Sequence, residues 1–244
     1  MLKTGSYILS IDAGTTGITI LAISHDGGII QKVYNEITQH YPKPGWVEHD
    51  PNEIWQVTRN LMGDLFRKLD VNLCQALGIT NQRETTVLWD KFTGKPIHPA
   101  IVWQCRRTAD LCESLKHQGL EKVVHEKTGL YLDSYFSATK AQWILDHVDR
   151  ARSMTESNSL AFGTIDTWLI YQLTGKKAHV TDHTNASRTL LYNIHTFDWD
   201  DDLLQVFQVS RTMLPEIHRS SDNFGETDPS LFDRSIPITG VAGD

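Results

Sequence analysis

The stretch that indicates the fold is residues 7–38, YILSIDAGTTGITILAISHDGGIIQKVYNEIT. It contains three runs rich in β-branched and other apolar residues, at 7–11, 18–23 and 29–38, and a short turn joins each run to the next. The second turn, His25-Asp26-Gly27-Gly28, is a typical hairpin signal. Strands joined by such short turns pair antiparallel, because a parallel pair needs a much longer crossover. We therefore expect the sheet to open with an antiparallel three-strand meander.

A helix is predicted after the loop that follows this stretch. Asp50 can cap it, Pro51 suits the first helical position, and Glu53 stands three residues after the cap, as in a capping box. Apolar residues then recur at helical spacing, namely Ile54, Val57, Leu61, Leu65 and Leu69. The pattern predicts an amphipathic helix with one apolar face.

The rest of the chain mixes strand-like and helical runs. The predicted strands are 76–80, 86–90, 100–103, 158–162 and 236–242, and the predicted helices are 108–117, 139–148, 166–173 and 200–207. No internal repeat and no linker composition interrupts this pattern. We therefore expect one α/β domain with an inserted subregion between about residues 85 and 160.

Composition excludes several classes of protein. The chain has 244 residues, of which 40% are hydrophobic and 22% charged, as in an ordinary globular domain. Its net charge of −7 disfavours a nucleic-acid partner or an anionic membrane surface. No run approaches the roughly 18 apolar residues of a membrane-spanning helix, and the first residues do not resemble a signal peptide. We expect neither a nucleic-acid partner nor membrane insertion.

The cysteines indicate a reducing compartment. Cys74, Cys105 and Cys112 are an odd, sparse set without a C-x-x-C pair, so they predict neither a disulfide framework nor a zinc site. We expect reduced, buried thiols and a cytoplasmic protein.

The turn between the first two strands, Asp12-Ala13-Gly14-Thr15-Thr16-Gly17, is the first candidate site. Such a turn exposes backbone N–H groups beside two hydroxyls, which suits phosphate oxygens. A carboxylate at the strand end could hold hydrated Mg²⁺. The alternative is a plain hairpin turn. Neither a Walker loop nor G-x-G-x-x-G occurs in the chain.

The polar run Thr80-Asn81-Gln82-Arg83-Glu84-Thr85 is the second candidate, because it follows a predicted buried strand. Ligands of open α/β sheets bind beyond the carboxyl ends of strands. An Arg beside a Glu offers donors and acceptors that suit vicinal hydroxyls. Adjacent strand residues face opposite sides, so both can reach one ligand only if the backbone at Arg83-Glu84 is irregular. The alternative is a solvated ion pair.

Three further candidates lie just past strands or before a helix. Trp103 ends the run 100–103, Tyr135 lies in a loop before a helix, and Asp244 follows Gly243 after the last strand. Packing and turn formation are the alternative roles. The chain contains neither H-E-x-x-H nor G-x-S-x-G, so a zinc protease or a serine hydrolase has no support.

Taken together, these motifs resemble those of the glycerol kinases, in the carbohydrate-kinase family that shares the actin and ribonuclease H-like fold. The resemblance covers nearly the whole chain and is carried by residues 12–16, 45–51, 78–85, 100–108, 162–169, 184–189, 193–196 and 240–244. It implies a ribonuclease H-like (actin-like ATPase) α/β domain, with a mixed sheet that begins with the antiparallel meander and carries helices on both faces.

The resemblance also implies a reaction and a set of residues. The reaction is transfer of the γ-phosphoryl group of ATP to the terminal hydroxyl of glycerol, with Mg²⁺. Its implied glycerol ligands are Arg83, Glu84, Tyr135 and Asp244, with Trp103 against the carbon side and Asp244 as catalytic base. Asp12 would position Mg²⁺ through water, and the phosphate turn would comprise Gly14, Thr15, Thr16 and Gly17.

In this family the glycerol site and the nucleotide site belong to two domains. The resemblance implies that residues 1–244 are the N-terminal glycerol-binding domain, that a C-terminal nucleotide domain is absent from this chain, and that the fragment alone is inactive. A homo-oligomer is an option for the full-length protein. The alternatives are a related sugar or polyol kinase, a non-catalytic polyol-binding domain, and an ATPase switch module of the same fold, against which the Arg83-Glu84 pair and Trp103 argue.

Overall fold

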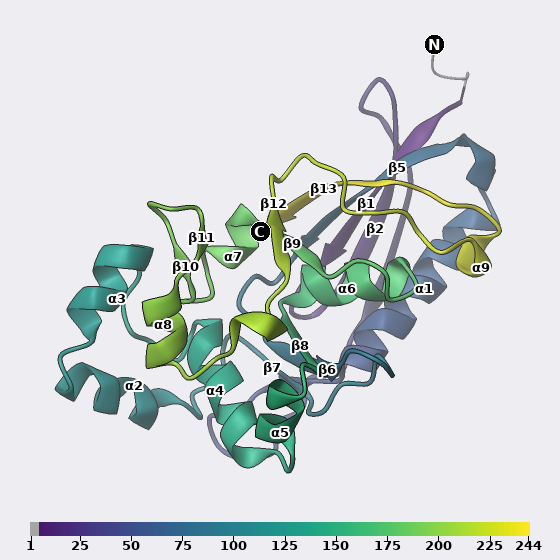
Figure 1. Ribbon diagram of the computed structural model, residues 1–244. Coiled ribbons are helices and arrows are strands. Elements are labelled where there is room, and N and C mark those ends of the chain that lie inside the picture. The colour runs from purple at the N-terminus through teal and green to yellow at the C-terminus, as the bar shows by residue number, and fades with distance from the viewer. Residues whose placement is uncertain (1–4) are drawn as a thin grey trace.

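The computed structural model describes residues 5–244, and its centre is a mixed five-stranded sheet in the order β13-β5-β1-β2-β3 (Figure 1). These strands are β1 (Tyr7–Ala13), β2 (Gly17–Ser24), β3 (Ile29–Glu36), β5 (Cys74–Asn81) and β13 (Ile238–Gly243). β1, β2 and β3 pair antiparallel, whereas β5 pairs parallel with both β1 and β13. The predicted antiparallel meander is therefore confirmed, and it is followed by parallel strands.

Helices, short ladders and the loops between them make up the rest of the described chain. The helices are α1 (Pro51–Phe66), α2 (Ala109–His117), α3 (Glu121–Thr128), α4 (Ser137–His147), α5 (Ala151–Glu156), α6 (Ile165–Leu173), α7 (His183–Ala186), α8 (Asp201–Val206) and α9 (Pro229–Phe232). The short strands are β4 (Glu48–His49), β6 (Val87–Asp90), β7 (Ala100–Ile101), β8 (Leu160–Gly163), β9 (Val180–Asp182), β10 (Tyr192–Asn193), β11 (Asp198–Trp199) and β12 (Glu216–His218). Short 3₁₀ turns lie at Val71–Leu73 and Arg211–Met213.

Helices α1 and α6 pack against one face of the sheet. The β1 side chains on that face, from Tyr7 to Ala13 at every second residue, are buried. On the opposite face of β1, Ile8 is 45% exposed and Asp12 is exposed as well. At β1, the face that carries Tyr7, Leu9, Ile11 and Ala13 is thus the one that packs into the core with α1 and α6. The alternation Ile8, Ser10, Asp12 is partly polar, so that face needs less apolar cover.

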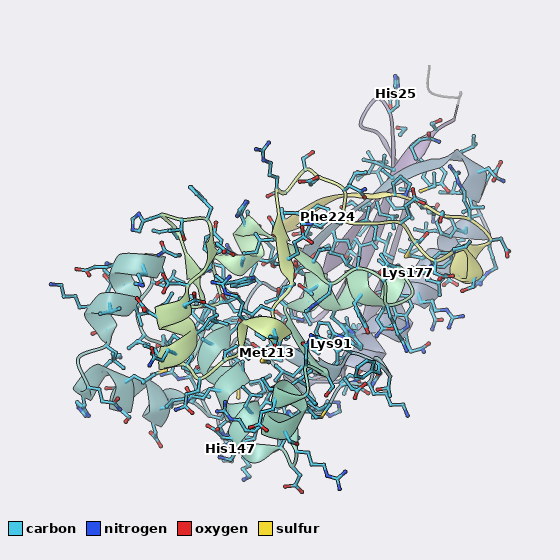
Figure 2. The ribbon with its side chains drawn as sticks, in the orientation of Figure 1. His25, Lys91, His147, Lys177, Met213 and Phe224 are labelled. Carbon is cyan, nitrogen blue, oxygen red and sulfur yellow. The ribbon has the colours of Figure 1, made fainter. Side chains whose placement is uncertain are left out.

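A second apolar core lies beside the sheet, among α4, α8 and their neighbours. Figure 2 shows Phe224, which belongs to the first core, and Met213, which belongs to the second. The β6–β8 ladder stands between the two cores, because alternate side chains of a strand face opposite sides. Trp89 packs into the first core and Leu88 into the second. The second core reaches Leu214, so the subregion extends beyond the predicted limit at residue 160.

The start of α1 agrees with the prediction at Asp50 but not at Glu53. Asp50 accepts the Asn52 N–H at 2.8 Å and Pro51 occupies the first turn. Glu53 does not turn back to the cap; its Oε1 accepts the backbone N–H and the hydroxyl of Thr38, at 3.1 and 2.8 Å. The capping-box prediction is wrong because this carboxylate ties the end of the third strand run to α1.

Other boundaries depend on contacts between distant segments. The strand predicted to end at Trp103 ends at Ile101, since its partner β4 offers only two residues. Several elements were not predicted, because they are short and bury few residues with a clear period: helices α3, α5, α7 and α9 and strands β4 and β9 to β12. The three cysteines are free and buried, as expected. Among residues 5–244, no helix combines the length and apolar character that crossing a bilayer would require.

Candidate active site

Sheet register brings the sequence-predicted residues to one edge. Asn81 of β5 is paired with Ala13 of β1 on one side and with Gly243 of β13 on the other. Because parallel strands share a direction, the segments that follow these strands leave the sheet at the same end. The turn after Asp12, the run at Arg83-Glu84, and Asp244 are thus neighbours.

The turn at residues 14–17 is closed by a backbone hydrogen bond from Gly14 N–H to Gly17 O, 3.1 Å long. A Cβ at Gly17 would approach Tyr34 Cε2 to 2.5 Å, so the close passage of β3 requires glycine there. Two side chains tie the turn to the rest of the site. Gln82 Nε2 donates to Gly14 O at 3.2 Å, and Trp103 Nε1 donates to Thr15 Oγ1 at 2.9 Å. Thr16 is exposed beside them.

Asp12 and Asp244 form a pair of neighbouring carboxylates. Partial loss of hydration, and then the charge of Asp244, raise the pKa of Asp12 above its ordinary value. A divalent cation with its water shell would relieve this repulsion, and carboxylate oxygens suit Mg²⁺. In the described part of the chain, no three His, Cys, Asp or Glu side chains gather into a metal cage. The donor set therefore fits a hydrated ion that is held mainly by other ligands.

Arg83 faces Asp244 across the ends of β5 and β13. The distance from Arg83 Nε to Asp244 Oδ1 is 3.9 Å. The Nε atom is buried and has no hydrogen-bond partner among residues 5–244. An unsatisfied buried donor is costly unless a ligand or water completes it. A ligand hydroxyl placed here would supply the missing acceptor.

Glu84 lies in the turn that follows β5, so the irregular backbone predicted at Arg83-Glu84 is confirmed. The residue is only 3% exposed. Its Oε1 accepts a hydrogen bond from Arg188 Nε at 2.8 Å. The alternative of a solvated ion pair between Arg83 and Glu84 does not hold, because Glu84 is buried and pairs with a residue from a distant segment.

Two aromatic rings form a wall beside these polar groups. The rings of Trp103 and Tyr135 are 5.3 Å apart at an angle of 53°. Tyr135 lies in the turn before α4, as predicted, and Trp103 lies in the turn after β7. Both are partly exposed, so their faces remain open to a ligand.

Sequence reasoning missed two cations that shape this site. Lys140, in the first turn of α4, is fully buried, and its Nζ donates to the carbonyls of Ser134, Tyr135 and Phe136 at 2.6, 2.5 and 2.9 Å. Burial lowers the pKa of Lys140 to about 7. The other cation is Arg188. It stands in the run 184–189, which carries part of the resemblance. That match was the one sequence signal that could have pointed to Arg188.

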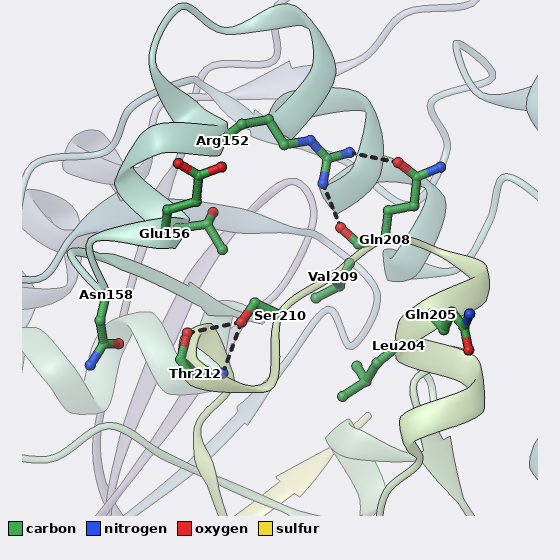
Figure 3. A pocket seen from close by; sticks show the side chains of 10 residues that line it. Arg152, Glu156, Asn158, Leu204, Gln205, Gln208, Val209, Ser210 and Thr212 are labelled. Atoms are coloured by element: carbon green, nitrogen blue, oxygen red, sulfur yellow. Dashed lines mark hydrogen bonds between the residues drawn. The ribbon is translucent and has the colours of Figure 1, made fainter.

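A separate cavity of about 610 Å³ lies between α5, α8 and the segment at residues 209–212 (Figure 3). Within it, Arg152 donates to Gln208 O at 2.6 Å, and the hydroxyls of Ser210 and Thr212 are 2.9 Å apart. None of the sequence-predicted site residues lines this cavity.

Comparisons with known proteins agree with this arrangement. The model of the FGGY family of carbohydrate kinases, N-terminal domain, matches residues 7–244. Glycerol kinases of Petrotoga mobilis and Carboxydothermus hydrogenoformans are each 53% identical to the chain, over 240 and 244 residues. These alignments cover 98% and 99% of the chain but 48% and 49% of the relatives. The chain thus spans about half the length of the curated relatives it matches.

Solved structures show the same fold. A crystal structure of Plasmodium falciparum glycerol kinase with ADP superposes with a TM-score of 0.95 at 36% identity, over 98% of this chain and 48% of that one. A ligand-bound xylulose kinase from Lactobacillus acidophilus, at 22% identity and a TM-score of 0.88 over 98% and 48% of the two chains, shares the fold. On the family match over nearly its whole length, the chain belongs to the FGGY family of carbohydrate kinases and corresponds to that family's N-terminal domain.

Proposed function

We propose that this chain is the glycerol-binding domain of a two-domain kinase that transfers the γ-phosphoryl group of ATP to the terminal hydroxyl of glycerol. The observation that carries the proposal is the meeting of Arg83, Glu84, Trp103, Tyr135 and Asp244 at one edge of the sheet, beside the turn at residues 14–17. The glycerol kinases that are 53% identical to the chain support the choice of substrate.

The proposed site matches a small polyol in its chemistry. Arg83 contributes donors, and Glu84 and Asp244 contribute acceptors, as vicinal hydroxyls require. Trp103 and Tyr135 offer apolar faces against which the carbon chain would pack. Asp244 would accept the proton of the attacking hydroxyl and aim its oxygen at the phosphoryl group.

The proposed nucleotide contacts of this chain are limited to the phosphate end. Backbone N–H groups of the turn and the hydroxyls of Thr15 and Thr16 would bind phosphate oxygens. Asp12 would hold Mg²⁺ through water, and that ion supplies charge neutralisation when bound. The remaining nucleotide contacts would come from a second domain. The free, buried cysteines support a cytoplasmic location.

The direct test is a calorimetric titration of the protein with glycerol, repeated with the Glu84→Ala variant. Loss of a hydrogen bond to a charged group should cost about 1.5–3 kcal/mol of binding free energy. Titrations with xylulose and gluconate separate glycerol from the larger substrates of related kinases. Unchanged glycerol affinity in Glu84→Ala, or a preference for a larger polyol, would contradict the proposal. A kinase assay on the full-length protein separates catalysis from polyol binding alone.

A further inference from the structure

Arg188 joins two parts of the proposed polyol site. Its Nε donates to Glu84 Oε1 at 2.8 Å, and its guanidinium lies over the ring of Phe136 at 5.0 Å and over that of Tyr135 at 5.9 Å. The Glu84 side chain is 4% exposed and that of Arg188 is 25% exposed. One side chain therefore contacts both the buried acid and the aromatic wall.

The backbone around Arg188 is itself tied to the end of the sheet. Arg188 N–H donates to Asn185 O, and Asn185 Oδ1 accepts from Asn81 Nδ2, at 3.0 Å each. Asn185 Nδ2 donates to Asp182 Oδ1 at 2.8 Å, within a buried network. This anchoring fixes the backbone from which the Arg188 side chain reaches Glu84.

The other charged and titratable groups near Glu84 are Lys140, Tyr135 and the neighbouring Arg83. Lys140 acts on Glu84 through its charge alone, because three backbone carbonyls accept from its Nζ. Arg83 points toward Asp244. Among residues 5–244, the hydrogen bond that reaches the Glu84 carboxylate comes from Arg188.

We propose that Arg188 is a positioning residue of the polyol site, which holds the Glu84 side chain in one orientation as a hydrogen-bond acceptor. The inference rests on the proposed function. With Oε1 engaged by Arg188, Oε2 is the oxygen that a polyol hydroxyl meets. Without the guanidinium, Glu84 would be a buried carboxyl with no cation in contact, and such groups take up a proton at higher pH than usual. A protonated Glu84 would lose much of its value as an acceptor.

The test measures the glycerol dissociation constant between pH 6 and 9 in the full-length protein, for the wild type and for Arg188→Met. Methionine keeps an unbranched, flexible side chain but removes the guanidinium, and with it both the donor to Glu84 and the cation over the Phe136 ring. We expect glycerol binding about 10- to 100-fold weaker at pH 7, as for a lost charged hydrogen bond. The affinity should recover as pH rises and Glu84 loses its proton, whereas the wild type should show no such recovery.

Three companion variants separate positioning from a general structural effect. Arg188→Lys keeps the charge and should restore most of the affinity and the wild-type pH profile. Glu84→Gln combined with Arg188→Met should abolish the extra pH dependence. Arg152→Met removes an arginine that lines the cavity of Figure 3 and pairs with Asp146, and should bind glycerol like the wild type. The charge of Glu84 raises the pKa of Lys140, so the contribution of Lys140 is compared among the variants that retain Glu84.

The outcomes are distinct. Failure of the wild type to bind glycerol would reject the proposed function, and the inference with it. Wild-type binding together with unaltered binding by Arg188→Met, or a loss that is equal at every pH, would overturn the inference alone. If Arg188→Met does not fold, Arg188→Gln and Arg188→Lys decide: equal affinities in these two variants and the wild type would reject a positioning role.

Discussion

Arg83 Nε lies 3.9 Å from Asp244 Oδ1, and Gly243 makes this approach possible. A Cβ at residue 243 would overlap Cγ and Cδ of Arg83. The two polar groups come from neighbouring parallel strands, β5 and β13, and the missing side chain between them lets the arginine lie across the strand end.

Gly243→Ala is therefore expected to displace Arg83 and to weaken glycerol binding, by about tenfold or more for the loss of one charged hydrogen bond. Stability should change little, since the arginine can swing toward solvent. Gly240→Ala on the same strand is the control, because its Cβ would stay 3.9 Å from the nearest atom, Gly78 Cα. Glycerol titration and thermal unfolding of both variants check this; equal glycerol affinities would contradict it.

Asp244→Asn tests the proposed base. Asparagine keeps the size and one acceptor but cannot take the hydroxyl proton, so kcat of the full-length enzyme should fall by about 10²–10⁴. Glycerol binding should change much less. Single-turnover kinetics and a glycerol titration on the same variant separate the two effects. If Asp244 only shapes a turn, asparagine is equally suited to it and kcat should stay near the wild-type value.

Residues 1–244 alone are expected to bind glycerol without turning over ATP. The proposed mechanism needs a second domain to complete the nucleotide site and to exclude water on closure. A coupled assay for ADP release, with and without glycerol, tests this against the full-length enzyme. Robust glycerol-dependent ADP release by residues 1–244 would show that the nucleotide site is complete without a second domain.

His49 should make the fold sensitive to acid. It is fully buried, and burial lowers its pKa from 6.5 to about 4. Its Nδ1 lies 3.3 Å from Gln82 Nε2, which donates only to the unprotonated nitrogen. The unfolded chain binds a proton at His49 more tightly than the folded chain does. The folded state therefore keeps its full stability above pH 6.5 and loses part of it as pH falls toward 4. The difference between the two pKa values corresponds to a loss of about 3 kcal/mol in the free energy of unfolding.

His49→Asn should remove that pH dependence, since asparagine can accept from Gln82 and does not titrate. In the wild type, His49 should make the free energy of unfolding, measured with urea between pH 4 and 6.5, fall by about 1.4 kcal/mol per pH unit. In His49→Asn this contribution to the slope should be absent. His25→Asn, in the exposed β2–β3 hairpin, is the control and should retain the wild-type slope. Parallel curves for His49→Asn and the wild type would exclude this role.

Lys140→Met should destabilise the fold and loosen the Tyr135 turn. The variant leaves three carbonyls without their donor, of which those of Ser134 and Phe136 are buried, at a cost of about 1–3 kcal/mol for each buried unsatisfied group. Urea unfolding measures the loss, and glycerol titration at low temperature measures the effect on the site. Lys116→Met removes a partly exposed lysine that pairs with the exposed Glu113, and should stay within about 0.5 kcal/mol of the wild type. Similar stability of the two variants would contradict the prediction.

The elements predicted from the sequence are those whose signals are local. The hairpin residues at 25–28 specify the antiparallel pairing of β2 and β3, and Asp50 with Pro51 specifies the start of α1, because each signal acts on backbone groups a few residues away. The polar runs after apolar strands indicated the candidate site for a similar reason: a strand must end before its neighbouring side chains can reach one ligand.

Local signals could not predict which side chains pair when the two residues lie far apart in the sequence. Glu53 had two possible partners, its own cap and Thr38, and only packing of the third strand run against α1 selects Thr38. Lys140 and Arg188 look like ordinary surface cations in the sequence, yet one is buried under a turn and the other pairs with Glu84 across 104 positions. Which cation meets which acid follows from the parallel register of β1, β5 and β13 and from the two cores. These are sums of many long-range contacts, and no short stretch of residues encodes them.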